Sequence, residues 1–449
     1  MTLLGVLGLL ALFVLLALRM PVALSMLGVG LIGTIIANAN QLIFAGMSSD
    51  QAWARGVRIA YSNLSGEAFE AASNFNLLVI PMFVLMGTLA GVSGMSNDLF
   101  TAAYRWMGHL KGGLASATIA ACAGFAALSG SSLASAVTMG RVALPQMKRY
   151  NYSDSLATGS VAAGGTLGFL IPPSGGMIIY AVLTEQSIGR LFMAGVFPGI
   201  ILTLLFIGAI YFTVSRNPEA GPRGEKTAWP ERREGLLRAL PILGVVFVTI
   251  GGMYTGFFTP VEASAVGAFF TFLVAAYRRT LSLEAIRRVI LQTMSATATV
   301  FLIIIGAFVF IPFISLTEVP ADLVTLLTSL PIGEYGVLLI IILIYIFLGM
   351  FLESIAMLVL TIPVVIPIAI GLDWDLIWFG IIVVIVLEMG MISPPVGINV
   401  FIVKSIVPSV PMGTIFRGIW PFWFAMAIML LLMVLFPQLA LFLPETLAG

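Results

Sequence analysis

Four short runs of serine, glycine and proline interrupt apolar stretches of this sequence. Two are residues 129–132 and 349–354, and the other two are centred on Pro172-Pro173 and Pro394-Pro395. A helix broken inside a membrane leaves backbone groups unpaired, and each costs several kcal/mol in hydrocarbon unless protein or water satisfies it. Freed carbonyls can bind a dehydrated cation, and freed helix N-termini can face an anion. The four breaks are therefore candidate binding sites.

The first cluster of candidates combines a serine run with the first proline pair. Glycine permits dihedral angles that turn carbonyls toward a site, and serine adds a hydroxyl oxygen. A low-charge lining of oxygen atoms suits a hard monovalent cation. The same residue types are common at close helix–helix contacts in membranes, so packing is the competing interpretation. The members are Ser129, Gly130, Ser131, Ser132, Gly164, Gly165, Gly168, Pro172, Pro173, Ser174 and Gly175.

The second cluster contains an acidic residue as well. Glu353 is an ionisable residue in an apolar run, which makes it a functional candidate that would bind a cation, carry a proton or cap a helix. Glu388 lies one turn before the second proline pair, where we expect a hydrogen bond between helices. Glu262, which follows Thr259-Pro260, is expected to cap a helix start. The members are Gly349, Glu353, Ser354, Thr361, Gly390, Ser393, Pro394, Pro395, Gly397 and Asn399.

The elements that must position these residues are membrane helices. Of the 449 residues, 60% are hydrophobic and 9% are charged, whereas soluble chains average about 45–50% apolar and about 25% charged residues. This composition predicts an all-α protein that crosses the lipid bilayer many times. The net charge of +1 argues against a nucleic-acid partner. The single cysteine, Cys122, excludes a disulfide within the chain and a thiolate metal cluster.

The sequence is predicted to repeat one plan in two halves, in a register that aligns Pro172-Pro173 with Pro394-Pro395. Each half would contain scaffold helices, a re-entrant helical hairpin and a broken transmembrane helix. The first half is 1–214, with its hairpin at 113–147 and its broken helix at 155–187; residues 215–238 form a cytoplasmic linker; the second half is 239–449, with its hairpin at 335–370 and its broken helix at 376–406.

Charge predicts that the two halves are inverted. Short cytoplasmic loops collect Lys and Arg. Lys148 and Arg149 follow the first hairpin, and the linker is rich in arginine, whereas Asp373 and Asp375 follow the second hairpin. The hairpins should therefore open on opposite sides of the membrane. Inverted repeats with broken helices are typical of secondary transporters, which bind their solute near the bilayer midplane.

Other functional classes fit the sequence less well. An intramembrane serine protease needs a Ser–His pair inside the bilayer, and His109, the only histidine, lies among basic residues near a boundary. An aspartyl protease needs two buried Asp residues, but every Asp here lies in a loop or at a boundary. No phosphate loop or metal-ligand run is present. Paired helix breaks also favour a closed midplane site over a passive channel. We therefore expect a transporter, and not an enzyme.

These motifs resemble the large membrane subunit of tripartite ATP-independent periplasmic (TRAP) transporters, of the DctM-like family, over nearly the full chain. The segments that carry the resemblance are 78–87, 128–132, 165–175, 256–263, 347–354 and 393–397. Gln146, where an acid is common, and Arg141 depart from the usual pattern. A stand-alone sodium/carboxylate symporter with a related hairpin design is the main alternative.

The resemblance implies an elevator mechanism in which sodium ions drive symport of a small organic anion, often a carboxylate, across the bacterial inner membrane. It implies no cofactor beyond these coupling ions. Its expected partners are a periplasmic substrate-binding protein and a small four-helix membrane subunit. Because the chain begins directly with the large-subunit pattern, we expect the small subunit to be a separate chain.

The resemblance also assigns roles within the two clusters. The expected sodium ligands are Ser129, Gly130, Ser132, Gly165, Gly168, Pro172, Ser174, Gly349, Glu353, Ser354, Gly390, Ser393, Pro394 and Gly397. The expected substrate contacts are Ser131, Pro173, Gly175, Pro395 and Asn399.

Overall fold

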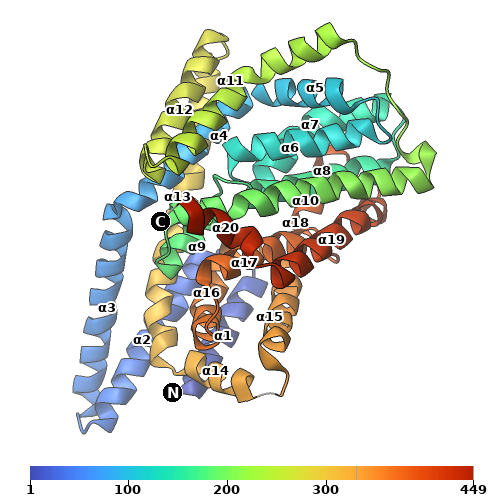
Figure 1. Cartoon of the computed structure of the whole chain (residues 1–449). Helices are drawn as coiled ribbons and strands as arrows, with labels where there is room; N and C mark the ends of the chain where they lie inside the picture. The colour runs from blue at the N-terminus through green and yellow to red at the C-terminus, as the bar shows by residue number, and fades with distance from the viewer. Residues whose placement is uncertain (330, 448–449) are drawn as a thin grey trace. The chain divides into compact units, whose positions relative to one another are not determined.

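The computed structural model describes residues 1–329 and 331–447, and every regular element in these ranges is a helix (Figure 1). Nine helical segments among the described residues are long and apolar enough to cross a membrane. The helices of the first half and the linker are α1 (Thr2–Ala17), α2 (Val22–Phe44), α3 (Ser49–Ser73), η1 (Phe75–Leu78), α4 (Val79–Val92), α5 (Met95–Met107), α6 (Gly113–Ser129), α7 (Ser132–Arg149), α8 (Asp154–Leu170), α9 (Gly175–Thr184), α10 (Ile188–Arg216) and η2 (Pro218–Ala220).

The second half continues with a similar series. Its helices are α11 (Trp229–Tyr254), α12 (Pro260–Tyr277), α13 (Leu283–Leu316), α14 (Val319–Ser329), α15 (Gly333–Gly349), α16 (Ser354–Gly371), α17 (Leu376–Met391), α18 (Ile398–Ile406), α19 (Met412–Leu435) and α20 (Gln438–Leu447).

The helices form two compact units, and each unit takes segments from both sequence halves. The first unit comprises Met1–Leu78, Ser295–Ile341 and Ile355–Leu376. The second comprises Val79–Met294, Ile342–Ser354 and Ile377–Gly449.

Small residues let the helices of the first unit approach closely. A Cβ added at Gly30 of α2 would lie 2.8 Å from the Val309 carbonyl oxygen of α13. A Cβ added at Gly306 of α13 would lie 2.8 Å from the Ala23 carbonyl oxygen of α2. No hydrophobic driving force acts between helices in lipid, so close packing of this kind stabilises their association instead. Helices α2 and α13 therefore pack closely against each other through small residues.

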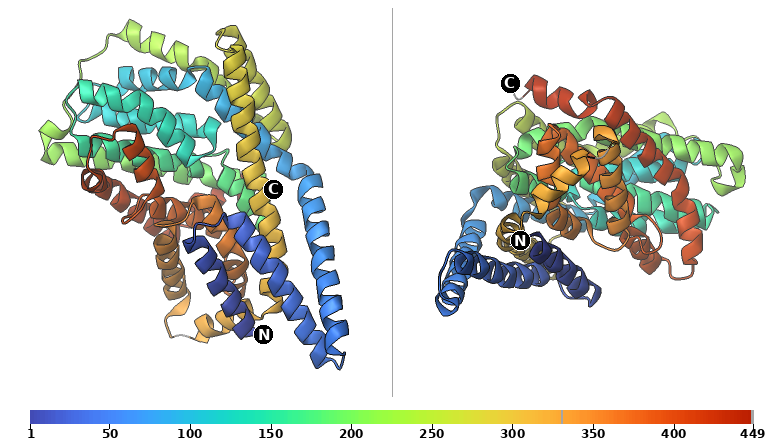
Figure 2. Two further views of the ribbon diagram at one scale, coloured as in Figure 1. Left: turned by 180° about the vertical axis from the view of Figure 1, so that it is seen from behind. Right: turned by 90° about the horizontal axis from the view of Figure 1, so that it is seen from below.

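In the second unit, α6, α7 and α8 pack side by side, and α10 lies along them (Figure 1). The same layer is seen from behind in Figure 2. Helices α18 and α19 also pack on α8, so this helix is enclosed. All of its residues from Leu156 to Leu170 are buried.

Serine and threonine side chains fix several helix starts in the second unit. The hydroxyl groups of Ser131 and Ser174 accept hydrogen bonds from the backbone N–H groups of the first turns of α7 and α9. Thr259 and Glu262 form a reciprocal capping box at the start of α12, which confirms the capping role expected for Glu262. Such caps satisfy N–H groups that have no partner within the helix.

The four helix breaks occur where the sequence predicts them. The register that aligns the two proline pairs also aligns Ser132, the first residue of α7, with Ser354, the first residue of α16. Helices α7 and α16 have the same length, 18 residues. The order and spacing of the hairpin and broken-helix elements therefore repeat along the chain.

Two helices are unlike a simple apolar span. Helix α3 has 25 residues and carries charged side chains, and α13 has 34 residues. Charged side chains such as Arg55 and Glu70 interrupt the apolar run in α3. Hydropathy therefore does not mark this helix, although its backbone is regular.

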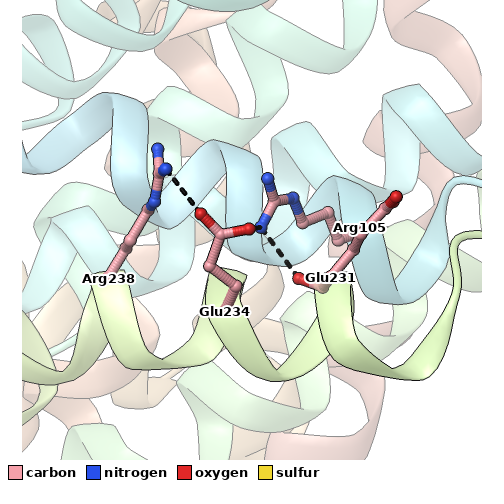
Figure 3. Close-up of polar contacts among 4 residues, drawn as sticks. All are labelled: Arg105, Glu231, Glu234 and Arg238. Carbon is pink, nitrogen blue, oxygen red and sulfur yellow. Dashed lines mark hydrogen bonds and ion pairs between the residues drawn. The ribbon is translucent and has the colours of Figure 1, made fainter.

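Polar contacts join α5 to α11 within the second unit (Figure 3). The Arg105 side chain donates a hydrogen bond to the Glu231 carbonyl oxygen at 2.8 Å and forms an ion pair with Glu234 at 3.1 Å. Arg238 pairs with the same carboxylate from one turn further along α11. These contacts connect a helix of the first half to the part of α11 that lies in the predicted linker, residues 215–238.

Candidate functional site

The first junction is the place where the tip of the first hairpin, residues 129–132, meets the break between α8 and α9, residues 171–174. The Gly175 backbone N–H donates a hydrogen bond to the Gly130 carbonyl oxygen at 3.0 Å. Gly130 ends α6 with a φ of 57°, and a Cβ there would lie 2.9 Å from the Pro173 carbonyl oxygen. Only glycine combines this left-handed conformation with so close an approach.

Glycines on α8 receive the backbone of the hairpin tip. A Cβ added at Gly165 would lie 3.1 Å from the Ser132 carbonyl oxygen, and one at Gly168 would lie 2.6 Å from the Ser131 carbonyl oxygen. The hairpin carbonyls therefore approach α8 on the face that these two glycines leave free. This arrangement is compatible with both the packing and the cation-binding interpretations of the cluster. The small residues create the close helix contact, and they also bring oxygen atoms together.

The serine hydroxyl groups of the first junction take part in local hydrogen bonds. Ser129 and Ser135 share one across the hairpin at 2.7 Å. Ser174 donates to the Phe169 carbonyl oxygen at 2.5 Å and accepts from the Met177 backbone N–H at 3.4 Å. A hydroxyl oxygen has two lone pairs, so Ser129 retains acceptor capacity whichever hydroxyl donates.

The second junction repeats this construction between the second hairpin tip, residues 350–353, and the break between α17 and α18, residues 392–397. The Gly397 backbone N–H donates to the Met350 carbonyl oxygen at 3.2 Å. Gly397 has a φ of 61°. A Cβ added at Gly349 would lie 2.9 Å from the Gly390 Cα atom. Each junction thus combines a backbone hydrogen bond with a close approach of two segments at a glycine residue.

Glu388 of α17 lies at the second junction. Its side chain is 1% exposed, and the Ser354 hydroxyl donates a hydrogen bond to its Oε1 atom at 2.9 Å. This confirms the interhelical hydrogen bond expected for Glu388. The hydroxyl of Ser132, from the first hairpin, faces the same carboxyl group, and the charge of Glu353 also acts on it. The Oε2 atom has no hydrogen-bond partner among the described residues.

The remaining predicted residues of the second junction differ in their surroundings. The Ser393 hydroxyl donates to the Met389 carbonyl oxygen at 2.7 Å and accepts from the Trp423 indole N–H at 3.0 Å. Asn399 is 0% exposed, yet its side-chain oxygen and nitrogen have no hydrogen-bond partner among the described residues. Pro394 and Pro395 are exposed, whereas their counterparts Pro172 and Pro173 are buried.

The structure thus groups the predicted sodium and substrate residues at two junctions within the second unit, whereas Thr361 of the second cluster lies in the first unit and donates to the Met357 carbonyl oxygen of its own helix. The sequence placed Ser354 at the tip of the second hairpin and Glu388 one turn before the second proline pair, but it did not pair them. Both are polar residues within apolar runs, and that shared property was the available signal. Within the described chain, no group of three or more His, Cys, Asp or Glu side chains is arranged to hold a metal ion. The arrangement provides backbone and hydroxyl oxygens with one buried carboxyl group, which are the kinds of group that coordinate hard cations and accept hydrogen bonds.

The fold is similar to those of two polytopic membrane proteins of known structure. The YdaH transporter of Alcanivorax borkumensis matches 86% of this chain and 89% of its own, with a TM-score of 0.57 at 14% identity. MtrF of Neisseria gonorrhoeae matches 86% of this chain and 84% of its own, with a TM-score of 0.56 at 13% identity. At these identities the likeness concerns the fold alone.

Sequence comparison identifies the family. The family model of the tripartite ATP-independent periplasmic transporter, DctM component, matches residues 9–439. The C4-dicarboxylate TRAP transporter large permease DctM of Pseudomonas aeruginosa is 34% identical over 85% of this chain and 89% of its own length. The chain therefore belongs to the DctM component family of TRAP transporters, and it is a transport protein, not an enzyme.

Relatives of this family differ in the solutes in their names. The sialic acid permease SiaM of Vibrio cholerae is 33% identical over 96% of both chains. The ectoine permease TeaC of Halomonas elongata is 33% identical over 82% of this chain and 86% of its own length.

Proposed function

We propose that this chain is the large membrane subunit of a sodium-coupled transporter that imports a small organic anion across the bacterial inner membrane. The single observation that carries this proposal is the pair of junctions, each of which brings a hairpin tip and a broken helix together through backbone groups. Freed carbonyls and helix N-termini at such breaks are the usual means by which secondary transporters bind coupling ions and anionic solutes. Family membership supports the same function.

The proposed coupling sites are the two junctions. At the first, Ser129 and the carbonyls of the hairpin tip supply neutral oxygens. At the second, the Ser354 hydroxyl and the carbonyls of the second hairpin tip supply further oxygens. Each junction would bind sodium through side chains and freed carbonyls, in keeping with the low-charge, oxygen-lined sites expected for this ion.

The proposed solute site lies beside the second break. Asn399 is buried there with both amide atoms unpaired among the described residues, and a buried polar group without a partner is costly. A bound carboxylate would accept a hydrogen bond from the Asn399 amide nitrogen. Two relatives are named for acids, C4-dicarboxylate and sialic acid, so a small organic acid is the proposed solute class.

The proposed transport cycle is an elevator movement. The hairpins and broken helices would move together as a transport domain, and the remaining helices would form the scaffold. A periplasmic binding protein would deliver the solute, and a small membrane subunit would brace the scaffold. In one relative, the DctMQ permease of Oleidesulfovibrio alaskensis, the matched region spans 53% of that protein. For this chain we propose a separate small subunit.

Uptake by reconstituted proteoliposomes tests the function. The chain is reconstituted with its small subunit, loaded binding protein is added outside, and an inward sodium gradient is imposed. Uptake should depend on sodium, on the small subunit and on the binding protein. Undiminished uptake after replacement of sodium by choline, with no proton gradient, would refute sodium coupling. Full uptake without the binding protein would favour the stand-alone symporter.

A further inference from the structure

Glu388 is a buried acidic side chain with no basic partner among the described residues. It is 1% exposed, and none of the ion pairs that the described residues form includes it. Its Oε1 atom accepts the hydrogen bond from Ser354, while its Oε2 atom has no partner there. An ionised carboxylate is not tolerated in such a place unless a positive charge or several donors compensate it.

The groups around Glu388 do not provide that compensation. Ser354 and Ser132 contribute hydroxyl groups from the first turns of α16 and α7, and a hydroxyl carries no net charge. The nearby charge of Glu353 is also negative. A cation bound at the free side of the carboxylate would neutralise Glu388 and would benefit from the hydroxyl oxygens of both hairpins.

The corresponding position of the first half has a neutral side chain. The register that aligns Pro172 with Pro394 aligns Thr166 of α8 with Glu388. Thr166 is equally buried, and its hydroxyl donates to the Ala163 carbonyl oxygen within its own helix. The carboxyl group is therefore not required by the repeated backbone arrangement, and it is specific to the second junction.

We propose that Glu388 is the anionic ligand of a monovalent cation bound where the tips of both hairpins approach α17. This inference rests on the proposed cation coupling and deepens it, because it names the charged ligand. Ser354 holds the carboxylate in position through Oε1, and Oε2 contacts the ion. The cation would then interact with both hairpins, with Ser132 of the first and Ser354 of the second.

The test is a cation titration of the thermal stability of the purified chain in lipid nanodiscs. Sodium, lithium or potassium chloride replaces choline chloride at constant ionic strength, which isolates binding from screening. We expect sodium to raise the Tm of the wild type. Glu388→Gln keeps the size and the hydrogen-bonding capacity of the side chain but removes its charge. It should raise the sodium concentration at half-maximal stabilisation about tenfold or more.

Two further variants make the result specific. Glu388→Asp keeps the charge on a side chain that is one methylene shorter. The sodium concentration at half-maximal stabilisation of this variant should lie between those of the wild type and Glu388→Gln. Thr166→Val changes the matched position of the first half without altering charge, and it should leave the concentration unchanged. If Glu388→Gln does not fold, the shift in Glu388→Asp decides, because a side chain that serves only as a hydrogen-bond partner predicts no shift.

The outcomes separate this inference from the proposed sodium coupling. A wild-type sodium response that Glu388→Gln retains unchanged would overturn the inference and leave the coupling intact. A wild type that responds to lithium or potassium but not to sodium, with the response weakened in Glu388→Gln, would support the ligand role and refute sodium as the ion. No response of the wild type to any of the three ions would overturn both.

Discussion

In the first junction a backbone hydrogen bond runs from Gly175 to Gly130, and in the second it runs from Gly397 to Met350. Both links place a residue just after a helix break against a hairpin tip. The two donors, Gly175 and Gly397, are equivalent in the register that aligns the proline pairs, and the two acceptors lie at nearly equivalent positions. The backbone of the two junctions therefore follows one plan, and a left-handed glycine lies at each link.

The side chains of the two junctions differ. The first is lined by neutral groups such as Ser129 and Ser135, and its two prolines are buried. The second contains the buried Glu388 beside Glu353, and its prolines are exposed. A repeated backbone can therefore support two binding chemistries, because ligand charge resides in side chains while the break itself depends on glycine and proline.

The largest expected effect tests the shared part of the comparison. Gly168→Val would place its Cβ 2.6 Å from the Ser131 carbonyl oxygen, and Gly390→Val would place it 2.7 Å from the Gly349 Cα atom. Overpacking of this kind costs about 1–3 kcal/mol or more. Both variants should lower the Tm and reduce sodium-driven uptake to background in proteoliposomes.

Gly208→Val is the control, because an added Cβ at Gly208 of α10 meets nothing within 4 Å. It should retain uptake. If only one of the two junction variants loses uptake, the glycine contacts do not have equivalent roles in the two halves.

A second test concerns the inversion of the two halves. Lys148, at the end of the first hairpin, and Asp373, after the second, are both exposed. In a Cys122→Ala background, a cysteine at position 148 should react with a membrane-impermeant maleimide from the cytoplasmic side only. A cysteine at position 373 should react from the periplasmic side only. Charge predicts this all-or-none difference.

The background substitution is safe for this purpose because Cys122 is fully buried and small. Labelling of both cysteines from the same side would contradict the inverted arrangement. The resemblance between the junctions would then have to be explained without an inverted repeat.

A third, smaller effect compares single hydroxyl ligands. Ser129→Ala removes one partner of the bond to Ser135, and Ser354→Ala removes the donor to the Glu388 carboxyl group. Hydrogen bonds to charged groups contribute about 1.5–3 kcal/mol, against about 0.5–1.5 kcal/mol for neutral pairs. Each variant should raise the sodium concentration at half-maximal uptake roughly tenfold. The larger increase is expected for Ser354→Ala.

Ser215→Ala at the exposed end of α10 serves as the comparison, and the measurement is the sodium concentration at half-maximal uptake. Wild-type sodium dependence in both hairpin variants would mean that the two clusters are packing contacts. A larger shift in Ser129→Ala than in Ser354→Ala would contradict the assignment of the charged ligand to the second junction.

The sequence was sufficient to predict the four breaks, because glycine, serine and double proline have local effects on a helix. It also predicted the helical capping by Glu262. The bond between Ser354 and Glu388 joins residues 34 positions apart on different helices. Such a pairing depends on tertiary packing, and no local pattern specifies it.

The same limit applies to α3 and to the two compact units. Helix α3 does not appear as an apolar run because it contains four charged residues, Arg55, Arg58, Glu67 and Glu70. The units combine segments from both halves, whereas repeats and linkers in the sequence divide the chain at residues 215–238. Contacts between distant segments decide the composition of a unit, and hydropathy does not report them.

The smallest expected effect distinguishes bracing from binding at Ser393. The Trp423 indole N–H donates to the Ser393 hydroxyl at 3.0 Å, which ties the second break to α19. Trp423→Phe removes this donor but keeps an aromatic ring. It should lower the free energy of unfolding by about 1 kcal/mol and leave the sodium concentration for half-maximal stabilisation within about twofold of the wild type.

Ser393→Ala should have a similar effect on stability, and the double variant should be less destabilised than the sum, because both substitutions remove the same bond. Ser393→Ala should in addition weaken the sodium response if its hydroxyl is a ligand. Thermal unfolding of the four proteins across a sodium titration measures both quantities. A strong sodium shift in Trp423→Phe would mean that the brace from α19 sets the geometry of the second junction, and equal sodium responses in all four would remove Ser393 from the set of ligands.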